Sequence, residues 1–147
     1  MSDILRAGVM GWPIAHSLSP RLHGHWLARF EIDGSYDAIA VEPEGLADAL
    51  SRLAGNGFRG VNLTVPHKQA ALTLVDRIDE TAKGIGAINT IIVEDDGALV
   101  GSNTDAFGFI ENLRDHVAGQ VAAGWSGRPA TVLGAGGAAR AVCTALL

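Results

Sequence analysis

The chain has 147 residues, of which 48% are hydrophobic and 18% are charged, and its formal net charge is −5 at pH 7. This composition is typical of a folded domain with its own core and excludes a disordered segment. The negative charge argues against nucleic-acid and anionic-membrane partners, and no apolar run approaches the ~20 residues of a membrane-spanning helix. The start of the chain lacks a signal-peptide pattern and Cys143 is the single cysteine, so we expect a reducing cytoplasm.

Strand and helix patterns alternate along the first part of the chain. Ser19 followed by Pro20 predicts a helix start, with Ser19 as the N-cap and Pro20 at the first helical position. The expected elements are a strand over Ile4–Met10, this helix with an apolar stripe of Leu22, Trp26, Leu27 and Phe30, a strand over Tyr36–Val41, and a helix over Pro43–Leu53 with Leu46, Leu50 and Leu53 on one face.

The middle of the chain predicts a buried strand that ends at a proline. Apolar and polar residues alternate there over Val61, Asn62, Leu63, Thr64 and Val65. Pro66 ends the strand because it has no N–H to donate, and it suits the first turn of the helix that follows. Lys68 would then project from the carboxyl end of a strand, the edge at which open α/β sheets bind ligands. A solvated surface lysine is the alternative interpretation.

The second half of the chain predicts a hairpin, a long helix and the start of a second unit. The expected elements are a short helix over Asp76–Lys83, strands over Ala87–Glu94 and Ala98–Gly101 joined at Asp96-Gly97, a helix capped by Asn103 or Thr104 with the core face Ala106, Phe109, Ile110, Leu113 and Val117, a connector over Gly119–Arg128, a strand over Ala130–Leu133, and a helix over Ala138–Leu147.

We therefore expect an α/β fold with a mostly parallel open sheet flanked by helices. Residues 1–118 would form one α/β domain, and residues 119–129 would be a linker. Residues 130–147 would be the first strand and helix of a second unit, which is incomplete because a strand and one helix cannot cover both faces of a parallel sheet. The sequence thus predicts a whole domain followed by the opening of another.

A glycine-rich loop supports the second unit. Gly134-x-Gly136-x-x-Ala139 follows a predicted strand and opens a helix, which is the context of the dinucleotide fingerprint. Its glycines allow a tight turn and a close approach of the backbone to a pyrophosphate at the helix N-terminus. The alternative is a glycine-rich turn of any α/β protein.

Two hydroxyls lie close together before the first helix. Ser17 and Ser19 can both donate hydrogen bonds to one small anion such as a carboxylate. Alternatively, Ser19 only caps the helix and Ser17 is a loop residue. His23 and His25 lack the spacing of metal ligands, and we predict no metal site.

Asn89 and Asp105 are the remaining candidate site residues. Asn89 lies in a predicted apolar strand, where a buried amide needs partners that a polyhydroxylated ligand or the backbone can supply. Asp105 lies in the first turn of a helix, where the helix dipole alone favours a carboxylate. If Asp105 instead meets Lys68 at the mouth of the sheet, the two form a proton-transfer couple in which the ammonium stabilises developing alkoxide charge.

Five motifs follow one another along nearly the whole chain. They are Gly-x-Pro-Ile-x-His-Ser-x-Ser-Pro-x-x-His over Gly11–His23, Asn-x-Thr-Val-Pro-x-Lys over Asn62–Lys68, Gly-Ala-x-Asn-Thr over Gly86–Thr90, Asn-Thr-Asp over Asn103–Asp105, and Gly-Ala-Gly-Gly-Ala-x-Arg over Gly134–Arg140. In this order they resemble the shikimate dehydrogenases. One departure is Gly24, which stands where the family commonly has an asparagine.

The resemblance implies an NADP-linked oxidoreductase that reversibly reduces 3-dehydroshikimate to shikimate in aromatic amino acid (chorismate) biosynthesis. It implies that residues 1–118 are a substrate-binding and catalytic domain and that residues 130–147 begin a Rossmann-like dinucleotide-binding domain. It also implies that Lys68 and Asp105 are the catalytic pair. The residues that would hold the substrate are Ser17, Ser19, Asn62, Thr64, Lys68, Asn89 and Asp105. The residues that would hold the cofactor are Gly134, Ala135, Gly136, Gly137, Ala138 and Glu80.

Several alternatives stay open at this point. A dehydrogenase of the same fold that prefers quinate fits the same motifs, and the residue that discriminates NADP from NAD lies past residue 147. Family members continue through a complete nucleotide-binding domain and return a final helix to the first domain. We therefore expect this chain to be an incomplete piece that does not turn over by itself, and a non-catalytic shikimate-binding module is the rival interpretation. The oligomeric state is also open, with a homodimer as one option.

Overall fold

The part of the chain that the computed structural model describes, residues 4–117 and 129–147, is an α/β fold. Its strands are β1 (Leu5–Gly11), β2 (Gly34–Ala40), β3 (Phe58–Leu63), β4 (Arg77–Ile78), β5 (Thr90–Val93) and β6 (Leu99–Ser102). Its α-helices are α1 (Ser19–Arg29), α2 (Leu46–Ser51), α3 (His67–Ala70), α4 (Glu80–Ile85), α5 (Asp105–Val117) and α6 (Gly137–Leu146). Short 3-10 turns, η1 (Pro43–Gly45) and η2 (Ala71–Thr73), precede α2 and follow α3.

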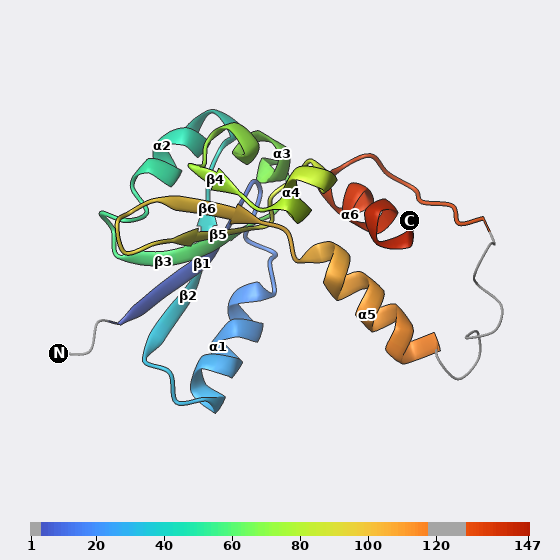
Figure 1. Cartoon of the computed structure of the whole chain (residues 1–147). Helices are drawn as coiled ribbons and strands as arrows, with labels where there is room; N and C mark the ends of the chain where they lie inside the picture. The colour runs from blue at the N-terminus through green and yellow to red at the C-terminus, as the bar shows by residue number, and fades with distance from the viewer. Residues whose placement is uncertain (1–3, 118–128) are drawn as a thin grey trace.

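The strands form one open sheet in the order β2-β1-β3-β5-β6-β4. β1 pairs in parallel with β2 and β3, and β4 pairs in parallel with β6. β5 runs antiparallel to both of its neighbours, so the sheet is mixed. Figure 1 shows α2 and α3 on one side of this sheet and α1 on the other. The predicted α/β class with an open sheet flanked by helices is confirmed, and three of the five strand pairs in the described chain are parallel.

The direction of the strands brings several chain segments to one edge of the sheet. Because β5 is antiparallel to both β3 and β6, these two strands run in the same direction and end at the same edge. Residues 64–68 leave the sheet there after β3, and residues 103–105 leave it there after β6. Asn89 directly precedes β5 at this edge, with its N–H bonded to the Ser102 carbonyl.

The main core lies between the sheet and the helices α2 and α3. The leucines that share one face of the second predicted helix are almost fully buried, as expected: Leu46, Leu50 and Leu53 are each 1% exposed. They pack with Val61 and Leu63 of β3 and with residues of β5 and β6. Val65 was expected to continue the apolar side of β3, but β3 ends at Leu63 and Val65 is 71% exposed.

The opposite face of the sheet is less completely covered. α1 packs mainly on β2 and β1, and none of its residues is buried. The predicted apolar stripe of α1 is therefore only partly inward: Leu27 is half-buried, whereas Trp26 and Phe30 are exposed. Beside α1 lies an apolar trough of about 510 Å³ over β1, β3 and β5, with Ala7 and Gly60 among its lining residues. A helical periodicity predicts which side of a helix faces inward, but the depth of burial depends on its neighbours.

Other predicted elements differ from the structure. Within the predicted helix Asp76–Lys83, Arg77 and Ile78 instead form the edge strand β4, and α4 begins after Asp79, whose carboxylate accepts the N–H of Ala82 at 2.6 Å. Residues 130–133 were expected to be a strand but pair with no strand in the described chain, and an isolated strand has no ladder to stabilise it. The predicted connector Gly119–Arg128 and the side chain of Val117 lie outside the described residues.

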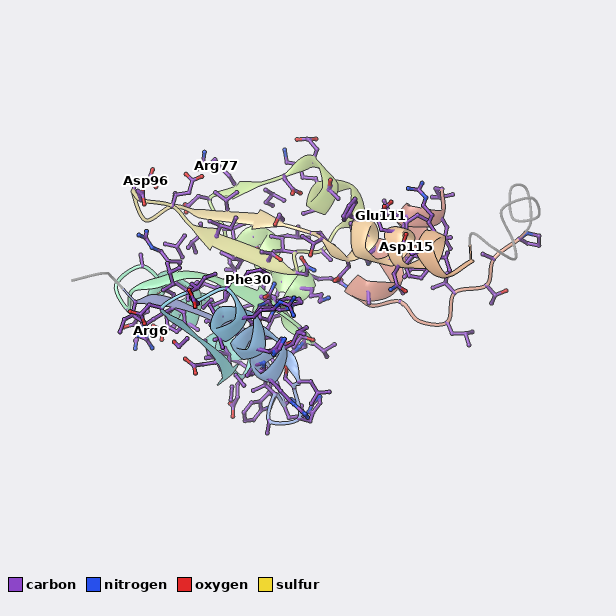
Figure 2. The ribbon with its side chains drawn as sticks, turned by 90° about the horizontal axis from the view of Figure 1, so that it is seen from below. Arg6, Phe30, Arg77, Asp96, Glu111 and Asp115 are labelled. Carbon is purple, nitrogen blue, oxygen red and sulfur yellow. The ribbon has the colours of Figure 1, made fainter. Side chains whose placement is uncertain are left out.

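The last two helices lie beside the sheet (Figure 1). α6 packs on α5 and α4, where Ala141 joins Ile85, Ala87 and Ala106 in a small second core. Figure 2 labels Asp96 at the β5–β6 hairpin, at one end of the molecule, and Glu111 and Asp115 on α5 toward the other. No helix among the described residues has the length and apolar character to cross a membrane.

Candidate active site

Lys68 and Asp105 meet at the edge where β3 and β6 end. Lys68 Nζ donates to Asp105 Oδ2 at 2.6 Å, and the two side chains are 17% and 30% exposed. Lys68 reaches this place because the chain turns into α3 directly after β3, and Asp105 because it is the first residue of α5. The predicted convergence of an ammonium and a carboxylate is therefore present in the geometry.

Asn89 holds the other oxygen of the carboxylate. Its side chain is almost buried at 7% exposure, and Nδ2 donates to Asp105 Oδ1 at 2.7 Å. Its Oδ1 accepts the N–H of Thr104 at 3.0 Å. Asn103, which the sequence offered as a helix cap, accepts the N–H of Asp105 with its side-chain oxygen at 2.9 Å. Asp105 is thus held at three points: its backbone N–H bonds Asn103, and its two carboxylate oxygens bond Lys68 and Asn89.

Asn62 lies near the end of β3, and Thr64 follows the strand at the same edge of the sheet. Asn62 Nδ2 donates to Thr90 Oγ1 at 3.0 Å and lies 3.3 Å from the Asn89 carbonyl oxygen. Thr64 is half-buried, and its N–H bonds the Met10 carbonyl at 2.9 Å. Gly11 leaves room for this threonine, because a Cβ at position 11 would lie 2.5 Å from Thr64 Cγ2.

The loop with the two hydroxyls leaves the same edge of the sheet after β1. It is tied to the segment before Lys68 by the N–H of Trp12, which bonds the Val65 carbonyl at 3.0 Å. Ser17 Oγ accepts the N–H of Ser19 at 3.3 Å. The prediction that Ser19 is the N-cap is wrong: Leu18 holds that position and Ser19 is the first helical residue. Both serines are half-buried.

The glycine loop also lies close to Lys68. A cavity of about 390 Å³ is lined by Thr64, Lys68 and Gln69 together with Gly134 and residues 136–139. Gly134 has a φ of +133°, which glycine adopts readily, and α6 begins at Gly137. A Cβ at Gly137 would lie 3.1 Å from Lys68 Cβ and 3.2 Å from Ala87 Cβ, so a larger residue would crowd the lysine.

Glu80, predicted to approach the cofactor, lies at the start of α4. Its carboxylate pairs with Lys83 at 2.7 Å, and its side chain is 90% exposed. Glu80 is not among the residues that line the cavity beside the glycine loop.

Three residues near the site escaped the sequence reasoning. Tyr36 on β2 donates its hydroxyl proton to Asn62 Oδ1 at 2.6 Å, and burial raises its pKa to about 12. His23 stacks on the Tyr36 ring with 3.9 Å between the ring centroids, and burial lowers the pKa of His23. His67 is 1% exposed, and its Nε2 lies 2.8 Å from the Val41 carbonyl oxygen. A signal existed only for Tyr36: a tyrosine in a half-buried strand needs a partner for its hydroxyl.

An open sheet with polar side chains gathered at the edge where β3 and β6 end is typical of α/β domains that bind ligands at the carboxyl ends of their strands. A family model described as the shikimate dehydrogenase substrate binding domain matches residues 9–91, more than half of the chain. The chain therefore belongs to the shikimate dehydrogenase family.

Individual relatives agree with the family match. The chain is 57% identical over 143 residues to the shikimate dehydrogenase (NADP(+)) of Rhodospirillum rubrum, a match that covers 96% of this chain and 49% of that protein. It is 54% identical over 142 residues to the shikimate dehydrogenase (NADP(+)) of Paramagnetospirillum magneticum, covering 95% and 50%. The chain thus spans about half the length of the curated relatives it matches.

Solved structures share the fold. Shikimate 5-dehydrogenase of Thermus thermophilus in complex with shikimate superposes with a TM-score of 0.86 at 47% identity, covering 97% of this chain and 52% of that one. The same enzyme in complex with NADP(H) and shikimate gives a TM-score of 0.85. A ligand-free 5-ketofructose reductase of a Gluconobacter strain gives 0.83 at 32% identity, covering 99% and 50%.

Proposed function

We propose that the protein carrying this chain catalyses the NADP-dependent, reversible reduction of 3-dehydroshikimate to shikimate in aromatic amino acid biosynthesis. The observation that carries this proposal is the pair of Lys68 and Asp105, which lie 2.6 Å apart. Lys68 also lines a cavity together with residues of the glycine loop. Relatives named shikimate dehydrogenase (NADP(+)) support the substrate and the cofactor.

The pair of Lys68 and Asp105 suits the proton-transfer half of this reaction. A carbonyl oxygen that becomes a hydroxyl gains a proton while its carbon gains a hydride, and a bound nicotinamide supplies the hydride. Lys68 would polarise the oxygen and donate the proton, because its ammonium is partly shielded from water and stabilises developing alkoxide charge. Asp105 would orient the ammonium through their 2.6 Å bond. In the oxidative direction the same pair would accept the proton.

The remaining polar residues would hold the substrate. Ser17 and Ser19 lie on a loop anchored beside Val65, and their hydroxyls can donate to a carboxylate. Thr64, Asn62 and Asn89 stand along the edge of the sheet toward Lys68 and Asp105, where amide and hydroxyl groups can bond the ring hydroxyls. The serines would thus bind the carboxylate of the substrate, while Lys68 and Asp105 would bind the oxygen on its reacting carbon.

The glycine loop fits the pyrophosphate of NADP. Gly134, Ala135, Gly136 and the first residues of α6, Gly137 and Ala138, would present backbone N–H groups to it. The fit rests on Gly137, which allows the helix start to lie against Lys68 without a side chain between them. Glu80 would reach the cofactor only if its carboxylate left Lys83.

Three wider features are part of the same proposal. We propose that residues 1–118 form the substrate-binding and catalytic domain, that residues 119–129 link it onward, and that residues 130–147 begin a dinucleotide-binding domain. A homodimer and a cytoplasmic location stay predictions. Sedimentation of the purified protein tests the first, and cell fractionation tests the second.

Steady-state kinetics of the full-length protein encoded by the gene test the proposal. We expect NADP-dependent oxidation of shikimate that exceeds the rates with quinate and with NAD. A higher kcat/KM for quinate would replace shikimate as the substrate. Binding of shikimate without cofactor-dependent turnover would support a non-catalytic module, and absence of both would refute the proposal.

A further inference from the structure

The apolar trough beside α1 contains a tyrosine hydroxyl that the proposed reaction has not used. Tyr36 pairs across the sheet with Ala7, which pairs in turn with Gly60, so this row of the sheet carries almost no side-chain bulk. The Tyr36 side chain can therefore cross β1 and bond Asn62 on β3 at 2.6 Å. With its pKa raised to about 12 by burial, the hydroxyl keeps its proton at neutral pH.

The orientation of the Asn62 amide follows from its neighbours. The Asn89 carbonyl oxygen lies 3.3 Å from Asn62 Nδ2, and a carbonyl can only accept a hydrogen bond. The nitrogen of the Asn62 amide must therefore face Asn89, and its oxygen must face Tyr36. Tyr36 is the donor in this bond, and without its hydroxyl the Asn62 amide is held only from its nitrogen, by Asn89 and Thr90, in the described chain.

The same direction of donation continues to the carboxylate. Thr90 Oγ1 accepts from Asn62 Nδ2 and can donate to Asn89 Oδ1 at 2.9 Å. Since Asn89 Oδ1 also accepts the Thr104 N–H, the Asn89 amide turns its nitrogen to Asp105 Oδ1 at 2.7 Å. We call this chain of hydrogen bonds, from Tyr36 through Asn62, Thr90 and Asn89 to Asp105, the relay. Every link has its donor on the tyrosine side, so each bond polarises the next.

We propose that Tyr36 is a positioning residue, which holds the Asp105 carboxylate through the relay in the orientation that pairs with Lys68. The relay itself is a property of this chain, and its effect on turnover rests on the proposed function. Tyr36 bonds the Asn62 oxygen, whereas the Asn62 nitrogen faces Asn89 and Thr90, so Tyr36 would act through Asn62 and would not touch the substrate. Its contribution would be the fixed geometry of Asn89 and Asp105 before substrate arrives.

The first test follows the side-chain amides by NMR in the full-length protein. Tyr36→Phe removes only the hydroxyl and keeps the ring that stacks on His23. We expect the side-chain N–H signals of Asn62 and Asn89 to shift or broaden. Ser35→Ala is the matched control, because it removes a hydroxyl from the same strand and the same trough, where Ser35 Oγ bonds only Asp37 at 3.4 Å in the described chain. Unchanged Asn89 signals in Tyr36→Phe would overturn the relay.

The second test is kinetic and separates positioning from binding. Tyr36→Phe should lower kcat roughly three- to tenfold, the size of one lost neutral hydrogen bond, with the KM for NADP unchanged and the KM for shikimate changed less than kcat. Ser35→Ala should match the parent. An unchanged kcat, or a loss confined to KM, would contradict a role through Asp105.

A double-mutant cycle shows whether the effect passes through the relay. Thr90→Val breaks the next link, and it also serves if Tyr36→Phe does not fold. If both substitutions act on Asp105 through the relay, the kcat of Tyr36→Phe/Thr90→Val should equal that of Thr90→Val within about twofold. A loss of kcat equal to the product of the two single-variant losses would refute an effect through the relay. If the parent protein shows no turnover, the proposed function fails, and the amide spectra still decide whether the relay exists.

Discussion

Two regions of the site differ in how many of their polar groups are hydrogen-bonded within the chain. The first region surrounds Asp105, and the second comprises the Ser17–Ser19 loop and the glycine loop. Around Asp105, both carboxylate oxygens, its backbone N–H and the Asn89 amide are bonded within the chain, and Asn89 and Asn103 are almost buried. In the Ser17–Ser19 loop, Ser17 Oγ accepts a single bond from Ser19, which leaves its proton to be donated elsewhere. The glycine loop is likewise exposed from Gly134 to Gly136.

This difference separates the positioning of reacting groups from the binding of ligand anions. A proton-transfer pair acts best when its geometry exists before the substrate arrives, and buried partners supply that geometry. Groups that bind a carboxylate or a phosphate must instead keep donors available, because the ligand provides the acceptor. Substitutions in the first region should therefore lower kcat, whereas those in the second should raise KM.

Replacement of Lys68 should give the largest effect. Lys68→Ala removes the ammonium that would donate the proton, and kcat of the full-length protein should fall about 10²- to 10⁴-fold, the usual worth of general acid–base catalysis. The dissociation constant for shikimate should change far less, and calorimetric titration can measure it. Arg52→Ala is the control, since Arg52 pairs only with Asp48 on the exposed side of α2 in the described chain. A kcat within threefold of the parent would remove Lys68 from the mechanism.

Removal of the loop hydroxyls should act on binding. Ser17→Ala or Ser19→Ala would delete a hydrogen bond to a charged carboxylate, and the KM for shikimate should rise roughly ten- to hundredfold. The kcat at saturating shikimate should stay within about threefold, because Lys68 and Asp105 keep their own partners. A fall in kcat with an unchanged KM would show that the two regions are not separate in function.

A side chain at position 137 should disturb the contact between the glycine loop and Lys68. The Cβ of Gly137→Ala would lie 3.1 Å from both Cβ and Cδ of Lys68, so the lysine or the start of α6 must move. We expect the KM for NADP to rise about five- to tenfold with a smaller loss of kcat, in the range of moderate overpacking.

The matched control for position 137 is Gly84→Ala. Gly84 is an exposed glycine of α4, and its added Cβ would meet nothing within 4 Å. This variant should keep the kinetics of the parent. If Gly137→Ala behaves in the same way, the glycine loop does not approach Lys68 in the working protein.

The sequence predicts much of the frame of the site because that frame follows from local rules. The helical spacing of Leu46, Leu50 and Leu53 predicts their burial, and a strand that ends at Pro66 predicts where Lys68 leaves the sheet. Strand direction then brings Asp105 to the same edge. These inferences need only the period of each element and the direction of its neighbours.

The parts that the sequence does not predict depend on contacts between distant segments. The bond from Tyr36 to Asn62 requires the register in which Ala7 stands between Tyr36 and Gly60, and no local pattern gives that register. The exposure of Trp26 similarly depends on what covers the trough beside α1, rather than on the spacing within the helix.

A substitution in α1 should have the smallest effect and should change stability alone. Gly24 lies inside this helix, is exposed, and an added Cβ would meet nothing within 4 Å. Gly24→Ala should raise the free energy of unfolding by about 0.5–1 kcal/mol, because alanine loses less backbone entropy in a helix. Urea unfolding of the full-length protein can measure this, and Ala28→Gly in the same helix should lower stability by a similar amount.

The kinetics of Gly24→Ala then test whether α1 is independent of the loop that precedes it. Ser19 is the first residue of α1, so a stiffer helix could alter how the two serines meet a carboxylate. If the loop is positioned by its bonds to the sheet, such as that of Trp12 N–H to the Val65 carbonyl, the KM for shikimate should stay within about twofold. A larger change would mean that the anion-binding region depends on the helix and not only on the sheet edge, and α1 would then belong to the site.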